Sequence, residues 1–310
     1  MPWLPLRSRL AVDDLRACIR DTFEDLANHK SEDLRAMVKD PGIRAVTLRM
    51  SLGTHVAANL IGAVHGASST LRSVSGKEFF QAVEGVLTQF RTERFGEVLF
   101  NIQGVPGFEE WIADFPQVPA SELAKMLTGR FAEIDTAGMM MNAGVLLSLR
   151  ARTNKPGDNY DCDLLVDGIE VAAEIKAKAD TTNVSPRTIQ RTIEEACEQL
   201  PASKPGVVWL NIPHAWTQSP VVQLNLDVAM IAVRQLPRPP IAVVAHWQWV
   251  EGLAVGKMYN LMSCAVDSKQ AALAKELDEA LLAQPATGTW VSFHTLVDEF
   301  ITAQTAQSLQ

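Results

Sequence analysis

The sequence predicts an α/β (α+β) protein with a mixed sheet and the core order helix, three strands, helix, strand, flanked by N-terminal and C-terminal helices. Three observations predict it. Apolar residues recur at helical spacing through the first 118 residues. Asp167-Gly168 separates two strand-like runs, which is typical of a hairpin. Ser185-Pro186 begins a second helix ahead of the apolar run GVVWLNI. We therefore expect a helical region at 1–118, a core at 119–266 and C-terminal helices at 267–310.

The N-terminal region is expected to be helical. Val12 to Leu26 carries apolar residues at helical spacing, and Leu52 to Ala67 is rich in small residues that allow close helix packing. Asp40-Pro41-Gly42 has the composition of a turn, and a further helical run is expected from Ser75 to about Phe100. The Pro/Gly-rich stretch from Gly104 to Pro119 is the best candidate for a domain boundary.

The core elements follow from breaks and periodicity. A helix from Glu122 to about Asn142 ends before Gly144, and a second runs from Ser185 to Leu200 before Pro201. Strands are expected at 145–150, 160–166, 169–176, 206–212, 241–250 and 258–266, and C-terminal helices at 270–284 and 291–304.

Composition limits the function classes. The chain has 310 residues, a net charge of −8 and 47% hydrophobic residues, which is globular and argues against a general histone-like nucleic-acid binder. Its four cysteines form no CxxC pair, so we expect reduced thiols and no zinc module. No run of eighteen apolar residues occurs, so we expect a cytoplasmic protein that does not enter a membrane.

The hairpin from Tyr160 to Lys178 is the segment most informative about function. With a two-residue loop, seven apolar residues share one face of the ribbon, as a core-facing surface requires. The other face carries charges at its open end, where Asp161 lies across from Glu174 and Asp163 lies diagonal to it. A loop longer by two residues would instead put Asp163 across from Glu174.

In either register two or three carboxylates converge. Like charges directly opposite one another destabilise a sheet, so a positive charge is expected between them. Lys176 supplies one. Clustered carboxylate oxygens also suit a hard divalent cation, so we expect Mg²⁺ or Mn²⁺ as the cofactor.

Asp163 followed by Glu174-Ile175-Lys176 on the next strand of a hairpin resembles the PD-(D/E)xK nuclease superfamily, which includes Holliday-junction resolvases and restriction-type nucleases. The resemblance covers about 120–213 and implies a restriction-endonuclease-like αβββαβ core. It implies Asp163 and Glu174 as metal ligands, the Ile175 carbonyl as a main-chain ligand and Lys176 as the catalytic lysine. Asp161 stays an alternative metal ligand. Family members also place a glutamate on the helix before the first strand, and Glu133 matches it.

The resemblance implies a metal-dependent endonuclease, with DNA as the expected substrate and RNA not excluded. Basic and polar side chains near the hairpin are the candidate nucleic-acid contacts: Arg150, Arg152, Lys155, Lys178, Arg187, Gln190 and Arg191. The N-terminal helices are candidates for homo-oligomer or protein-partner contacts. The alternative is a catalytically silent protein that keeps the nuclease fold and acts in binding or assembly.

Overall fold

A computed structural model describes residues 9–32, 35, 39–65, 89–113, 132–153, 155, 157–178, 182–213, 216, 220–251, 254–283 and 290–308. The chain divides into two compact units, Met1–Gly104 with Thr287–Gln310, and Val105–Ala286. The C-terminal helices, which the sequence analysis placed in one segment, lie in different units. In the described part of the chain, no helix is long and apolar enough to cross a membrane.

The first unit is helical. Its helices are α1 (Val12–Ala27), α3 (Pro41–His65), α5 (Gln89–Ile102) and α12 (Phe293–Ser308). α3 and α5 approach closely at Gly53 and Gly96, where a Cβ on Gly96 would overlap the Gly53 backbone. The Glu97 carboxylate on α5 accepts hydrogen bonds from Trp290 Nε1 and Phe293 N, both at 2.9 Å. These bonds attach the start of α12 to α5.

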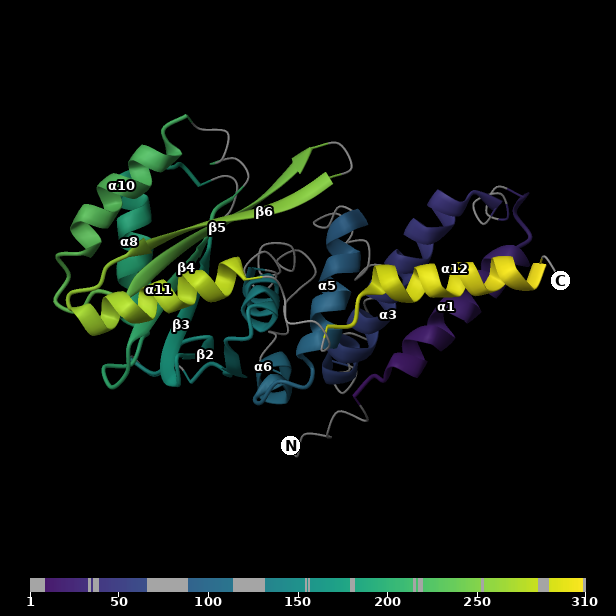
Figure 1. Ribbon diagram of the computed structural model, residues 1–310, viewed down its shortest axis with the longest axis horizontal. Coiled ribbons are helices and arrows are strands. Elements are labelled where there is room, and N and C mark those ends of the chain that lie inside the picture. Colours follow the sequence, from purple (N-terminus) through teal and green to yellow (C-terminus); the bar gives the residue numbers. More distant parts are fainter. Residues whose placement is uncertain are drawn as a thin grey trace. The chain divides into compact units, whose positions relative to one another are not determined.

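The second unit contains a six-stranded mixed sheet in the order β1-β2-β3-β4-β5-β6 (Figure 1). β3, β4 and β5 are parallel, and the other neighbouring pairs are antiparallel. The fold is therefore mixed α/β, as the sequence predicts. The strands are β1 (Leu146–Leu149), β2 (Cys162–Val166), β3 (Ile169–Ala177), β4 (Gly206–Asn211), β5 (Ala242–Glu251) and β6 (Ala254–Ser263).

Helices lie on both faces of this sheet. α8 (Pro186–Cys197) and α10 (Val222–Val233) share a core with Ala172, Val208 and Val243 on one face. The helical segment 132–142 contacts the other face, where Cys162 Sγ lies 3.6 Å from Met140 Sδ. α11 (Ser268–Leu282) contacts both β2 and β6 and so crosses the sheet (Figure 1). A short helix, α6 (Phe108–Ala113), precedes the core.

Most predicted elements occur within a few residues of the expected bounds, with three differences. The helix α6 lies within the Pro/Gly-rich stretch from Gly104 to Pro119, where no helix was expected. The turn expected at Asp40-Pro41-Gly42 is wrong, because α3 begins at Pro41 and Asp40 Oδ1 accepts hydrogen bonds from the N–H groups of Gly42 and Ile43. α10 was not predicted, because its apolar residues cover two faces and its hydrophobicity shows little helical periodicity. The parts of the expected helices at 66–67, 75–88 and 122–131 lie outside the described residues.

Candidate functional site

The hairpin between β2 and β3 has the two-residue loop that the sequence predicts. Asp167 and Gly168 both have positive φ, 49° and 72°, as a tight hairpin turn requires. Cys162 pairs with Ala173 and Val166 with Ile169, so the shorter of the two registers considered above is the observed one. The apolar side of the ribbon therefore faces the core, and its charged side carries the acidic residues.

The ladder becomes irregular at the open end of the ribbon, and this irregularity positions Asp161. Asp161 precedes β2, and its N–H donates to the Ala173 carbonyl at 3.1 Å. The Ile175 N–H donates to the Asp161 side-chain oxygen Oδ2 at 2.7 Å instead of to a strand carbonyl. The carboxylate is thereby held against β3, beside the residue that follows Glu174.

Glu174 and Lys176 form a close ion pair on β3. Their side chains lie on the same face of the strand, and Lys176 Nζ is 2.6 Å from Glu174 Oε1. Glu174 is only 2% exposed. Its other oxygen, Oε2, is buried and accepts from no N–H or hydroxyl donor among the described residues, although the Asp161 carboxyl hydrogen-bonds to Glu174 and lowers the pKa of Glu174. A buried carboxylate oxygen in that state destabilises the fold unless a proton or a cation satisfies it.

The helical segment 132–142 brings a third carboxyl group to the cluster. Glu133 is 4% exposed, and its Oε1 lies 3.1 Å from Arg152 Nη2. Its charge raises the pKa of both Asp161 and Glu174, so it acts at the same site. The sequence prediction of a glutamate that reaches the hairpin from the preceding helix agrees with this geometry.

The cluster has perturbed proton affinities. Burial raises the pKa of Asp161 well above its usual range, and the charges of Glu133 and Glu174 raise it further. Burial also raises the pKa of Glu174; the Lys176 ammonium lowers it, Glu133 raises it, and the value is about 6. Glu174 therefore changes charge near pH 6, well above the pH at which an ordinary glutamate does so.

Asp163 lies in a different network. It accepts hydrogen bonds from Tyr160 Oη at 3.0 Å and Ser148 Oγ at 3.1 Å, and it forms an ion pair with Lys204. Burial raises the pKa of Asp163, but these bonds lower it below its ordinary value overall. The carboxyl group that the resemblance names first is thus already saturated by protein donors, and the one beside Glu174 is Asp161.

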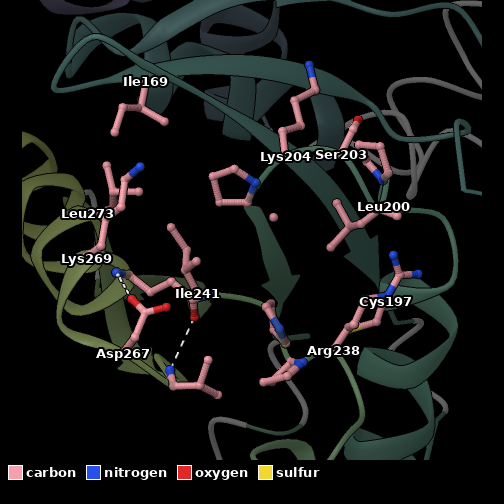
Figure 2. Close-up of a pocket in the computed structure, with 18 of the residues that line it drawn as sticks. Ile169, Cys197, Leu200, Ser203, Lys204, Arg238, Ile241, Asp267, Lys269 and Leu273 are labelled. Carbon is pink, nitrogen blue, oxygen red and sulfur yellow. Dashed lines mark hydrogen bonds between the residues drawn. The ribbon is translucent and has the colours of Figure 1, made fainter.

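Lys204 also lies in the wall of a hollow of about 410 Å³ at the amino ends of β3, β4 and β5. Figure 2 shows Lys204 and Ser203 on one side of this hollow and Asp267 and Lys269, at the start of α11, on another. The Lys204 amine points away from the middle of the hollow (Figure 2). The hollow is thus lined by residues other than the carboxyl cluster, which lies toward the carboxyl end of β3.

The cluster offers the carboxylate oxygens that a divalent cation prefers as ligands, but these oxygens are not arranged around a common point. Asp161 and Glu174, two buried carboxyl groups with raised pKa values, lie beside the charge of Glu133, and a hard ion would stabilise such a group of oxygens. Within the described residues, however, no three Asp, Glu, His or Cys side chains are placed to hold a metal ion. The Glu174 and Asp161 oxygens bonded to Lys176 and the Ile175 N–H would have to exchange those bonds for the ion. A carbonyl ligand from Ile175 stays a prediction.

The predicted nucleic-acid contacts fall into two groups. Arg150 and Arg152 form ion pairs beside the hairpin: the half-buried Arg150 lies 2.9 Å from Asp158 and stacks 4.4 Å from the Tyr160 ring centre, and the exposed Arg152 pairs with Glu133. The remaining five are exposed or half-buried: Lys155, Lys178, Arg187, Gln190 and Arg191. Lys178 follows β3 and Arg187 begins α8, so both lie at the carboxyl end of β3, where Lys176 also lies.

The sequence pattern identified neither the contact of Lys204 with Asp163 nor the full burial of His246. Lys204 follows Ser203 in a loop before β4, and no local pattern links it to Asp163, 41 residues earlier. His246 stands at the carboxyl end of β5, is fully buried, and lies 3.9 Å from Asp135 of the segment 132–142.

Comparison with known proteins identifies no relative: no protein-family model, no curated protein and no solved structure matches the chain. The resemblance to the PD-(D/E)xK superfamily therefore stays a prediction based on the hairpin and its acidic residues.

Proposed function

We propose that this chain is a Mg²⁺- or Mn²⁺-dependent nuclease of the PD-(D/E)xK kind that hydrolyses phosphodiester bonds, with DNA as its substrate and the cytoplasm as its location. The supporting observation is the set of three buried carboxyl groups beside one ammonium group on β3: Glu133, Asp161, Glu174 and Lys176. A cation bound there would supply a hydroxide near neutral pH and neutralise charge on the phosphate.

The protein groups have separate roles in this proposal. Asp161 and Glu174 would hold the ion, and Glu133 would raise its affinity through added negative charge. Release of Glu174 by Lys176 would let the ammonium group bind a phosphate oxygen and stabilise the charge that develops there. Lys178 and Arg187, at the same end of β3, would bind the phosphates on either side.

The experiment is cleavage of plasmid DNA by the purified full chain with Mg²⁺, with Mn²⁺ and with a chelator. We expect cleavage only with a divalent ion, and a loss of roughly a hundredfold or more in Lys176→Ala and in Asp161→Asn. Asp163→Asn should retain most of the activity, because Asp163 is bonded to Lys204 and Tyr160. Glu170→Gln, on the exposed part of the same strand, is the matched control.

Comparing the cleavage activities of Asp161→Asn and Asp163→Asn tests which aspartate binds the ion. If Asp163→Asn is inactive while Asp161→Asn cleaves normally, the ion is held by the set that the resemblance names, and our assignment is wrong. Cleavage that survives both Lys176→Ala and Asp161→Asn would place the activity elsewhere. Parallel assays on duplex DNA, single strands and RNA identify the substrate class.

The second candidate is a catalytically silent binding or assembly protein with the same fold. The observation that favours it is that two carboxylates of the cluster already form ion pairs within the protein, Glu174 with Lys176 and Glu133 with Arg152. This candidate predicts nucleic-acid or protein binding without cleavage under any divalent ion. It also predicts that Glu174→Gln leaves that binding unchanged.

A further inference from the structure

Trp247 is a partly exposed tryptophan at the carboxyl end of the parallel strands. The other tryptophan side chains that the structure describes in the second unit, Trp111, Trp209 and Trp216, are at most 2% exposed. Trp247 packs against the core shared by α8, α10 and the sheet, but it is not fully buried. β4 pairs with β5 only as far as His246, and β5 and β6 run on beyond the other strands (Figure 1). Trp247 is therefore held by packing and still open to solvent.

Trp247 lies on the same face of the sheet as Lys176. Lys176 pairs with Leu210 and Leu210 pairs with Ala245, so these three side chains share one face. Trp247 is two residues beyond Ala245 on β5, and because side chains alternate along a strand, it shares that face. β4 alone separates β3 from β5, which puts their backbones about 10 Å apart. Trp247 thus lies near the ammonium group to which the proposed function assigns a phosphate oxygen.

The proposed site has few cations with which to hold nucleic acid. The proposed function uses Lys176, Lys178 and Arg187, in a chain whose net charge is −8. Proteins that bind a duplex through its backbone commonly neutralise more phosphates than three side chains can. Stacking of a base on an aromatic ring adds affinity without charge. A base inside a duplex is covered on both faces by its neighbours, so an unpaired nucleotide is the one that can stack on a protein ring.

We propose, resting on the function proposed above, that Trp247 is the stacking platform for an unpaired nucleobase of the substrate. Lys176 holds the phosphate at the cleaved bond, and the base of a nearby nucleotide lies on the indole ring. The class of substrate is then single-stranded DNA, or DNA with unpaired nucleotides at the cleaved position, in preference to continuous duplex.

The test is the binding of fluorescently labelled oligonucleotides to the purified full chain, measured by anisotropy with a chelator present so that no strand is cleaved. We expect a single strand to bind at least about tenfold more tightly than the same sequence in a duplex. Trp247→Leu keeps apolar contacts with the core, and it should weaken single-strand binding roughly tenfold or more while leaving duplex binding unchanged. Trp247→Phe keeps an aromatic ring and should retain most of the affinity. Unchanged circular dichroism and melting temperature show that each variant is folded.

Single strands that lack one base test the contact directly. An abasic position at the stacking site should weaken binding to the wild type and have little further effect on Trp247→Leu, because the ring and the base act as a pair. The proposal is overturned if Trp247→Leu weakens the binding of single strand and duplex equally, or if it changes neither. Abasic strands that lose the same affinity for wild type and Trp247→Leu at every position also overturn it.

These outcomes are separate from those that test the nuclease activity. A chain that binds single strands through Trp247 but cleaves none with any divalent ion overturns the proposed function and leaves the stacking site intact. A chain that cleaves continuous duplex as fast as single strands, with Trp247→Leu as active as wild type, overturns the stacking site alone. A chain that binds no nucleic acid overturns both.

Discussion

Replacing Glu174 by glutamine should make the protein more stable at pH 8. The substitution keeps the shape of the side chain and leaves an amide oxygen as an acceptor for Lys176, which lies 2.6 Å from Glu174 Oε1. It removes a charge that is 2% exposed and whose second oxygen has no N–H or hydroxyl donor among the described residues. Removing an incompletely compensated buried charge relieves its desolvation.

The size of the gain follows from the pKa of Glu174. Burial, offset in part by Lys176, raises this pKa from 4.5 to about 6. At about 1.4 kcal/mol for each tenfold change in proton affinity, the ionised form costs the folded state about 2 kcal/mol. A raised carboxyl pKa lowers stability as pH rises from the ordinary pKa through the folded-state pKa. The advantage of Glu174→Gln should therefore fall below about 0.5 kcal/mol near pH 4.5 and be complete above pH 7.

The assay is urea unfolding of wild type and variant at several pH values between 4.5 and 8, with and without Mg²⁺. Glu170→Gln, which neutralises a carboxylate that is 61% exposed on the same strand, is the control and should change stability little. Mg²⁺ should stabilise the wild type and have much less effect on Glu174→Gln, because the ion binds the folded state through that carboxylate.

Two results would refute the reasoning. If Glu174→Gln is less stable than wild type at pH 8, the pair with Lys176 stabilises the fold more than burial of the charge destabilises it. If the difference is independent of pH, the raised pKa of Glu174 is not its source. Equal stabilisation of both proteins by Mg²⁺ would leave the stability argument intact and remove Glu174 from the ion site.

Three other positions give predictions by thermal unfolding. Gly107→Ala should destabilise the second unit by roughly 2–4 kcal/mol, because the φ of Gly107 is +80° and a Cβ there would overlap the Leu149 carbonyl. Gly144→Ala should destabilise it less, because Gly144 has a similar φ of +71° but no atom lies near its Cβ position. Ser185→Ala should cost about 1 kcal/mol, since Ser185 Oγ accepts from Thr188 N at the start of α8; Ser185→Thr should restore most of it. Lys204→Met should cost roughly 1–3 kcal/mol at pH 7 by leaving Asp163 without its ammonium partner. Since the pKa of Asp163 is lowered, that loss should shrink as pH falls below the ordinary aspartate value, and a loss that persists in acid would contradict the role.

The sheet could be predicted because its signals are local. Asp167-Gly168 specifies the turn, and the alternation of apolar residues along Cys162–Val166 and Ile169–Ala177 specifies which face each side chain takes. Of the two registers that this pattern left open, the structure has the one with the two-residue loop. The cap at Ser185 and the proline after it fix the start of α8. Each of these signals depends on residues only a few positions apart, so the local structure that it predicts depends little on distant parts of the chain.

The site could be predicted only in part, because side-chain partners are not local. Alternation along the ribbon puts Asp161, Asp163 and Glu174 on one charged face, but it cannot say which aspartate meets Glu174. That choice depends on Lys204, 41 residues away from Asp163, and on the irregular end of the ladder at Ile175. The α10 helix was missed for a related reason, since a helix that is apolar on its outer face has no polar side to reveal its period.

The surroundings of Asp161, Glu174 and Glu133 explain how three carboxyl groups can lie together in the folded protein. The Asp161 carboxylate accepts the Ile175 N–H, so one charge is satisfied by the backbone of the strand that carries Glu174. Lys176 and Arg152 each neutralise one further carboxylate. All three partners can exchange these bonds for bonds to other groups with little movement of the strands, because two are side chains and the third is a ribbon-end hydrogen bond. Binding of a divalent ion to these carboxyl groups would break their ion pairs and free the Lys176 and Arg152 side chains to bind an incoming phosphate. Lys176→Ala and Arg152→Ala should therefore weaken DNA binding more in the presence of Mg²⁺ than in its absence, and equal weakening in both conditions would contradict this coupling.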